Sequence, residues 1–306
     1  MKGLDLCREF WFACGLPTFR ENCPEVLEHA AIGLVGEGSD CFGFDDEISR
    51  DHDWGPGFCV WLTEDAMARF GEKVQQVYAS LPDEYLGFRR LRVSEQTANR
   101  VGIQEIGEFY YRYTGLMTPP ECIDDWRGIP EYALATVTNG EVFCDPIGVF
   151  SAFREKLLSY YPEDLRRKKL AAASALAGQS GQYNYYRCVQ RGEKVAAMQA
   201  LSEFTAQSEQ ILFLLNRKYS PYYKWTHHAL RLLPILGVEI GVELEHLYDK
   251  PLDAGSRIER ISSLLIHEIC RQGLSDSKSD FILNHGETIQ YSISDATLRW
   301  LPLMAE

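Results

Sequence analysis

The amino-acid sequence predicts an α+β protein in two parts. An N-terminal α/β domain with a small mixed sheet is expected over residues 1–150, and a C-terminal helical bundle over residues 151–306. Before residue 150, short apolar runs bounded by glycine, proline and acidic residues recur, as is typical of strands. Beyond it, strand signals almost vanish and apolar residues repeat at helical spacing. At 306 residues, 45% of them hydrophobic, the chain can bury a core in each part.

Four segments of the first domain are predicted to be strands. An apolar run at residues 30–35 ends in a glycine-rich turn, and a second run at 57–62 follows a Trp-Gly-Pro-Gly kink. Residues 101–106 and 141–146 supply the other two. Between the second and third strands, residues 63–81 are predicted to form a helix, because a threonine cap and two acidic residues open the segment and a proline follows it.

The remaining helices are predicted from their start and stop signals. Residues 2–14 read as a first helix that ends near Gly15-Leu16-Pro17. In the second domain, Pro162 marks a helix start and Gly178 a stop. A Ser-x-x-Glu capping box at residues 256–259 predicts the start of a later helix.

Composition narrows the class of partner. A formal net charge of −13 argues against a nonspecific nucleic-acid or anionic-membrane surface, since both depend on clustered lysine and arginine. The nine cysteines are scattered, odd in number and free of any Cys-x-x-Cys pair, so we expect reduced thiols. No stretch has the length of an uncharged membrane span, and a cytoplasmic protein is expected.

Residues 36–62 carry the clearest chemical signal. Gly38 and Ser39 follow the first predicted strand, and Asp51 and Asp53 come twelve and fourteen positions after Ser39. In an extended segment, residues two apart project to the same face, so both carboxylates can converge on one point. Two acids at one point repel each other unless a cation lies between them. A hard divalent ion, Mg²⁺ above all, completes the pattern.

A Gly-Ser turn followed by two aspartates suits nucleotidyl transfer. The amides and hydroxyl of Gly38 and Ser39 can hold triphosphate oxygens, while aspartates hold Mg²⁺ ions that bridge those oxygens. The alternative for an isolated acidic pair is a solvated surface loop. A calcium loop is a weak alternative, because Asp45-Asp46-Glu47 lacks the alternating ligand spacing of such loops.

The segment GEGSDCFGFDDEISRDHDWGP, residues 36–56, resembles the polymerase-beta-like nucleotidyltransferase superfamily and, within it, the DUF4037 group. The segment LLNRKYSPYYKW, residues 214–225, extends the resemblance into the second half, which is similar in kind to the helical domains of aminoglycoside and lincosamide nucleotidyltransferases. The resemblance implies that Gly38 and Ser39 bind the triphosphate and that Asp51 and Asp53 bind a two-ion Mg²⁺ site. It also implies a phosphate contact from Lys224.

One departure from the superfamily pattern concerns a third carboxylate. The resemblance implies an acid within Val101-Gly102-Ile103 that completes the metal site and acts as the base, but the middle residue is glycine. Glu105 is the nearest substitute and is our candidate catalytic residue beside the two aspartates. Asp145 is a second candidate. If neither reaches the metal, catalysis is expected to be feeble or absent.

Two clusters of the second domain have competing interpretations. Lys224 lies among Tyr219, Tyr222, Tyr223 and Trp225, which could stack on a base or sugar, although such aromatics are more often core residues. The run Arg166-Arg167-Lys168-Lys169 is predicted to be a solvated helix face.

From the sequence we therefore expect a Mg²⁺-dependent nucleotidyltransferase that moves an NMP from an NTP, ATP by preference, to a hydroxyl or amine of a small molecule or protein. The acceptor is expected between the domains. The alternative is a noncatalytic nucleotide-binding or regulatory protein with a degenerate nucleotidyltransferase fold.

Overall fold

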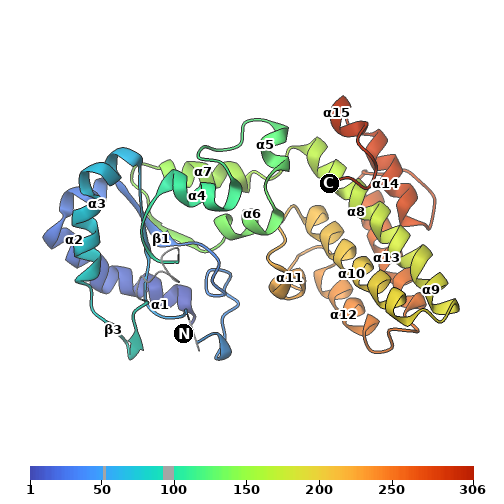
Figure 1. Cartoon of the computed structure of the whole chain (residues 1–306), viewed down its shortest axis with the longest axis horizontal. Helices are drawn as coiled ribbons and strands as arrows, with labels where there is room; N and C mark the ends of the chain where they lie inside the picture. The colour runs from blue at the N-terminus through green and yellow to red at the C-terminus, as the bar shows by residue number, and fades with distance from the viewer. Residues whose placement is uncertain (51–52, 92–99) are drawn as a thin grey trace. The chain divides into compact units, whose positions relative to one another are not determined.

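The computed structural model describes residues 1–50, 53–91 and 100–306, which form two compact units, Met1–Ser159 and Tyr160–Glu306 (Figure 1). The fold is mixed α+β, with a small mixed sheet in the first unit and a helical second unit. The division lies after Ser159 rather than at residue 150. The reason is that α7 (Val149–Leu158) packs within the first unit, where Phe153 stacks on Tyr110 with ring centroids 3.7 Å apart.

The first unit alternates short strands with helices. Its elements, in chain order, are α1 (Gly3–Phe10), a π-helix (Trp11–Gly15), α2 (Leu16–Asn22), a 3₁₀-helix (Pro24–Glu28), β1 (Ala30–Leu34), a 3₁₀-helix (Ile48–Arg50), β2 (Cys59–Leu62), α3 (Glu64–Ala79), β3 (Glu84–Tyr85), β4 (Phe88–Arg89), β5 (Gly102–Glu105), α4 (Ile106–Thr114), α5 (Ile123–Arg127), α6 (Glu131–Thr138), β6 (Glu141–Cys144) and α7. The predicted strands at 30–35, 57–62, 101–106 and 141–146 are thus confirmed as β1, β2, β5 and β6.

The four-stranded sheet has the order β5-β2-β1-β6, with β1 antiparallel to both of its neighbours and β2 parallel to β5. Gly33 pairs with Cys59, Cys59 with Gly102, and Leu34 with Glu141. The end of β1 and the starts of β2, β5 and β6 therefore lie together. We call this the loop end of the sheet and the opposite one the far end.

Helices cover both faces of this sheet (Figure 1). On one face, alternate β1 and β2 residues, Ile32 and Val60 among them, join a buried cluster with Phe10 and Val74 from α1 and α3. On the other face Trp61 stacks on Phe150 of α7, with ring centroids 4.0 Å apart. The alternation of burial partners follows from the two-residue period of a strand.

The first helix does not end near Gly15-Leu16-Pro17 as predicted. The chain continues through the π-helix into α2, and Pro17, which has no N–H to donate, lies where the hydrogen-bonding pattern changes from the π-helix to α2. Gly15 has an ordinary helical φ of −60° and is needed for space, because a Cβ there would lie 2.5 Å from the Trp11 ring.

The second unit consists of helices. They are α8 (Glu163–Ala177), a π-helix (Gly178–Tyr185), α9 (Tyr186–Gln190), α10 (Lys194–Asn216), α11 (Tyr223–Leu230), α12 (Gly237–Leu247), α13 (Gly255–Arg271), α14 (Ile282–Tyr291) and α15 (Ala296–Arg299). α8 ends at Ala177, but Gly178 does not end the helical run, because the chain continues there as a π-helix. The predicted capping box is wrong, because α13 begins at Gly255 and Ser256 already lies inside its first turn.

The basic run of α8 is not a solvated face. Arg166 is 2% exposed and Lys168 is fully buried. The Lys168 ammonium donates to the Gln290 side-chain oxygen at 3.0 Å and to the backbone carbonyls of Pro302 and Leu303 at 2.8 and 2.9 Å. The prediction failed because these acceptors come from segments more than a hundred residues away.

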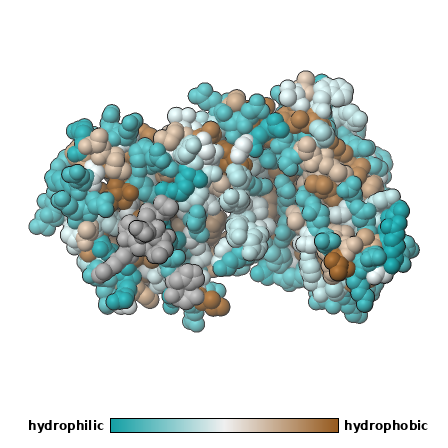
Figure 2. Space-filling view, in the orientation of Figure 1, coloured by the Kyte–Doolittle hydropathy of each residue, from teal (hydrophilic) through white to brown (hydrophobic). Residues whose placement is uncertain are grey.

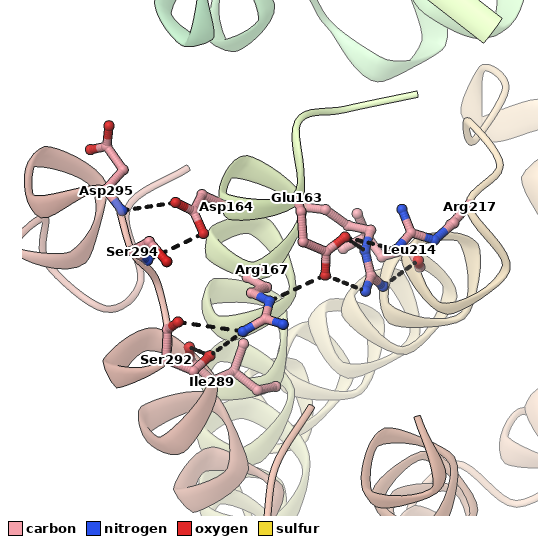
Figure 3. Close-up of polar contacts among 10 residues, drawn as sticks. Glu163, Asp164, Arg167, Leu214, Arg217, Ile289, Ser292, Ser294 and Asp295 are labelled. Atoms are coloured by element: carbon pink, nitrogen blue, oxygen red, sulfur yellow. Dashed lines mark hydrogen bonds and ion pairs between the residues drawn. The ribbon is translucent and has the colours of Figure 1, made fainter. Parts of the chain in front are cut away.

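Glu163, at the start of α8, forms ion pairs with the neighbouring arginines (Figure 3). It accepts from Arg166 at 2.8 Å, Arg167 at 3.1 Å and Arg217 at 2.7 Å. Partial burial raises the pKa of Glu163, but the hydrogen bonds and charges of Arg166, Arg217 and Arg167 outweigh it and lower the pKa to about 2. The next residue, Asp164, accepts from the backbone N–H groups before α15. The start of α8 is thereby tied to α10 and to the C-terminal helices.

Within the three described ranges, no helix is long and apolar enough to cross a membrane. On the face shown in Figure 2, hydrophobic residues form small separate patches among hydrophilic ones. An extended apolar surface is therefore not a feature of that face.

Candidate functional site

The predicted Gly-Ser turn lies at the loop end of the sheet, directly after β1. Its first residue, Gly36, is pinned by Asn139: the Gly36 N–H donates to Asn139 Oδ1 at 3.0 Å, and Asn139 Nδ2 donates to the Gly36 carbonyl at 2.7 Å. Beyond the turn, the Gly140 N–H donates to the Cys41 carbonyl at 2.8 Å. The turn is therefore held at both ends by the segment that leads into β6.

A buried ion pair lies under the turn. Asp40, which follows Ser39, is fully buried, and both of its carboxylate oxygens accept from Arg100 Nη2 at 2.7 Å. Burial alone lowers the pKa of Arg100, but the charge and hydrogen bonds of Asp40, together with smaller contributions from Cys41 and Cys7, outweigh it and raise the pKa, so the guanidinium stays charged. Because an isolated buried charge is costly, each partner depends on the other.

Arg100 also explains why residue 38 is glycine. A Cβ on Gly38 would clash with Arg100 Nη1 and with Asp40 Oδ1. Among the described residues, the Ser39 hydroxyl has no hydrogen-bond partner. At this turn a ligand can come close to the Gly38 backbone, and the Ser39 hydroxyl is free to donate a hydrogen bond to it. Both features suit an anionic ligand.

Asp53 lies at the same end of the sheet, and its backbone carbonyl accepts from Arg100 Nε at 2.8 Å. Its side chain is exposed, and no described residue makes a hydrogen bond or ion pair with its carboxylate. The expectation that Asp53 lies on an extended segment is wrong: its φ is +52°, and β2 starts only at Cys59. Its predicted partner Asp51 falls outside the described residues.

A second buried acid fixes the loop between the turn and β2. The Asp45 carboxylate accepts from the indole N–H of Trp54 at 3.0 Å and from the backbone N–H of Gly3 at 2.8 Å. Gly3 is the first residue of α1, so Asp45 caps that helix although it lies 42 positions away. Trp54, the residue next to Asp53, is therefore tied through Asp45 to the start of α1.

Buried thiols line the underside of the loop end. Cys7 and Cys41 pack together in a small core cluster, and Cys59 lies at the start of β2. Burial raises the pKa of Cys59 to about 12 and also raises the pKa of Cys7 and Cys41. The Cys59 thiol donates to the Arg100 carbonyl, and the Cys7 thiol to the Gly55 carbonyl. As protonated donors these sulfurs are poor ligands for a soft metal, whereas the free Asp53 carboxylate fits a hard cation such as Mg²⁺.

Neither substitute for the third carboxylate lies at the loop end. Glu105 ends β5 and is level with Leu62, three residues along the strand from the Cys59–Gly102 pair. Its carboxylate accepts from the N–H groups of Gly107 and Glu108, so it caps α4. Asp145 follows β6 at the far end and accepts from the N–H groups before and inside α7. Both acids serve as helix caps.

Gly102, at the position where the superfamily pattern places an acid, has a φ of +100°. Its N–H donates to the Phe58 carbonyl at 2.9 Å. A residue with a side chain is strained at that φ, so the backbone itself disfavours an aspartate here. The described loop end therefore contributes one unengaged carboxylate from the predicted set, that of Asp53.

Lys224 lies in the first turn of α11, in the second unit, and is exposed. Its ammonium lies 5.3 Å from the centre of the Trp225 ring. Tyr222 and Tyr223 beside it are 53% and 79% exposed, whereas Tyr219 stacks on Tyr160. Tyr219 is therefore a half-buried packing residue, whereas the exposed pair is not part of the core.

Sequence reasoning did not single out Arg100, Asp40, Asp45 or Asn139. Two signals were present: Asp40 directly follows the Gly-Ser turn, and Arg100 directly precedes the predicted third strand. Residues in these places lie at strand ends on the same side of a sheet. An opposite charge pair there is a reasonable candidate for joining two loops.

The comparison with known families assigns one segment. Residues 126–226 match the DUF4037 family. That family is described as a domain of unknown function, and the match covers about a third of the chain. It confirms the predicted DUF4037 resemblance and includes residues 214–225, but it stops short of the Gly-Ser turn and Asp53. No curated protein and no solved structure matches the chain.

Proposed function

We propose that the protein is a Mg²⁺-dependent nucleotidyltransferase that uses an NTP, ATP by preference. Gly38 and Ser39 bind the triphosphate, and Asp51 and Asp53 bind the metal. This extends the DUF4037 match to the superfamily that the residues of the N-terminal unit resemble.

One observation carries the proposal: Arg100 contacts both halves of the candidate site. Its Nη2 holds Asp40 beside the Gly-Ser turn, and its Nε holds the backbone of Asp53. The residue that follows Ser39 and the backbone of the residue that carries the free Asp53 carboxylate are thus tied to one guanidinium group. Transfer from a metal-bound triphosphate requires both a phosphate-binding group and a metal-binding carboxylate.

The reaction forms one bond and breaks one. A hydroxyl or amine of the acceptor attacks the α-phosphorus, the bond between the α-phosphorus and the bridging oxygen breaks, pyrophosphate leaves, and the acceptor releases its proton to the solvent. Asp51 and Asp53 would hold Mg²⁺, which would neutralise charge on the phosphate oxygens. The protein orients the triphosphate through the backbone and hydroxyl of Ser39. The acceptor is a small molecule or a protein.

A specific observation favours a second candidate, a noncatalytic nucleotide-binding or regulatory protein. The superfamily pattern needs a third carboxylate, but Gly102 has a backbone unsuited to an acid, and Glu105 and Asp145 cap helices at the far end. A site with two acids can hold a metal-bound nucleotide without activating an acceptor.

The test separates the two candidates. The full chain is incubated with Mg²⁺ and labelled ATP across an acceptor panel, and pyrophosphate release and nucleotide binding are measured. Transfer that is lost in Asp53→Asn and kept in Glu47→Gln, an exposed acid of the same loop, supports the enzyme. Binding without turnover on every acceptor supports the second candidate. Absence of Mg²⁺-dependent nucleotide binding contradicts both.

A further inference from the structure

Arg100 has more hydrogen-bonding capacity than the fold uses. Its Nη2 is bound to both Asp40 oxygens, and its Nε is bound to the Asp53 carbonyl. The third nitrogen, Nη1, makes no hydrogen bond with a residue in the described ranges. Its two N–H groups are therefore available to a ligand.

Nη1 lies in a particular place, on the side of Gly38 where a side chain would otherwise project. The Arg100 side chain keeps 14% of its surface exposed although its partner Asp40 is fully buried. Asp40 thus fixes the guanidinium group, while part of the Arg100 side chain remains accessible to solvent. A planar group fixed at two nitrogens needs little further ordering when it binds through the third.

We propose that Arg100 is a phosphate-binding residue: its Nη1 donates to a polyphosphate oxygen of the nucleotide held at Gly38 and Ser39. The proposal rests on the proposed function and adds a cation that the sequence pattern did not include. It also gives a reason for the glycine at position 38, which leaves Nη1 uncovered. Because Arg100 Nε also donates to the Asp53 carbonyl, one guanidinium group would then connect the bound phosphate with the loop that carries Asp53.

The ligand class follows from the chemistry. A guanidinium recognises phosphate oxygens and not the base, so the contribution of Arg100 belongs to the polyphosphate chain. Inorganic tripolyphosphate should therefore compete for the same contact. The probes are a nucleotide with a methylene bridge between the α- and β-phosphates, which blocks transfer, and tripolyphosphate alone.

Two variants of the full chain test the role. Arg100→Lys keeps a positive charge against Asp40 and loses the fork of donors. The double variant Asp40→Asn with Arg100→Gln removes both charges together, which avoids leaving one buried charge unpaired. The matched control, Glu243→Gln with Arg257→Gln, removes a carboxylate–arginine pair in the other unit, joined at 3.0 Å. Melting temperature is recorded for each variant.

The expected result is a loss of about tenfold or more in affinity for the Mg²⁺ complex of the methylene analogue in the double variant, with a smaller loss in Arg100→Lys. The affinity for tripolyphosphate, measured by competition, should fall by the same factor. The control variant should bind both probes with the affinity of the unmodified protein. If the affinity is unchanged in the variants that fold, the role of Arg100 is overturned and the proposed function still stands. If the double variant unfolds, Arg100→Lys alone decides the matter. If the unmodified protein binds neither probe, both proposals fall.

Discussion

The Glu105 carboxylate accepts a hydrogen bond from the backbone N–H of Glu108 at 2.8 Å. An acid committed to a helix start is a structural residue, so Glu105→Ala should lower the free energy of unfolding by about 1 kcal/mol. Nucleotide binding per folded molecule should not change. Chemical denaturation and calorimetric titration measure the two quantities.

Glu108→Ala is the matched control for that prediction. Glu108 is an exposed acid in the first turn of the same helix, and its carboxylate makes no hydrogen bond or ion pair with a residue that the structure describes, so its removal should cost less than that of Glu105. A large loss of turnover in Glu105→Ala with normal stability would instead restore Glu105 as the third carboxylate.

Gly102→Asp replaces the missing acid at the position indicated by the superfamily pattern. Because the φ of Gly102 is +100°, we expect a destabilisation of about 1–3 kcal/mol and no gain in Mg²⁺ affinity. Gly128→Asp is the control, since Gly128 has a φ of −70° and a Cβ there would meet its nearest neighbour at 3.7 Å. Increased Mg²⁺-dependent turnover in Gly102→Asp would contradict the prediction.

Lys168→Met should strongly destabilise the second unit. The substitution fills a similar volume but leaves the Gln290 oxygen and the carbonyls of Pro302 and Leu303 without their donor, at a cost of about 2–4 kcal/mol. Limited proteolysis should then cleave the C-terminal segment faster. Lys169→Met, which removes a longer contact with Glu306 at 3.9 Å, should cost less, because it removes one ion pair instead of three hydrogen bonds.

Glu163→Gln should reveal a pH-dependent contribution to stability. The pKa of Glu163 is lowered to about 2, so its charged form stabilises the fold above the ordinary pKa of 4.5, and this stabilisation is lost as the pH falls from about 5 to 2. We expect a difference of about 1–2 kcal/mol at pH 7, reduced by the partial exposure of the side chain, which disappears near pH 2.

Urea denaturation of both proteins across that pH range measures the difference. Glu239→Gln is the control: Glu239 is an exposed glutamate in the first turn of α12 and pairs with no described cation. A difference between Glu163→Gln and the unmodified protein that is constant with pH would show that the arginines stabilise α8 by packing rather than by charge.

Much of the fold could be predicted because the signals are local. The apolar runs of β1 and β2 and the Thr63 cap, which accepts from the Ala66 N–H at 3.3 Å, are both readable within a few residues. Gly15 and Gly178 match the sequence pattern of helix stops, but at each position glycine instead leaves room for a neighbouring side chain that packs closely against the helix. A Cβ on Gly178 would lie 2.9 Å from Leu283, more than a hundred positions along the chain.

The site was predictable only in part for the same reason. The place of the Gly-Ser turn followed from the apolar run before it, whereas the conformation of Asp53 depends on Arg100, 47 positions away. Glu105 is a candidate for the third carboxylate only by its proximity to Gly102 in the sequence. The strand register determines its position in the sheet: Glu105 is level with Leu62 and thus lies at the far end.

The buried thiols under the loop end have a practical consequence. Cys7, Cys41 and Cys59 are fully buried or nearly so, with pKa values raised by burial, whereas Cys122 is exposed. Alkylation at neutral pH must therefore wait for the surrounding loops to open, while Cys122 reacts directly. The rate at which the buried three are labelled is an internal reporter of how often the loop end opens, readable by mass spectrometry without knowing the acceptor.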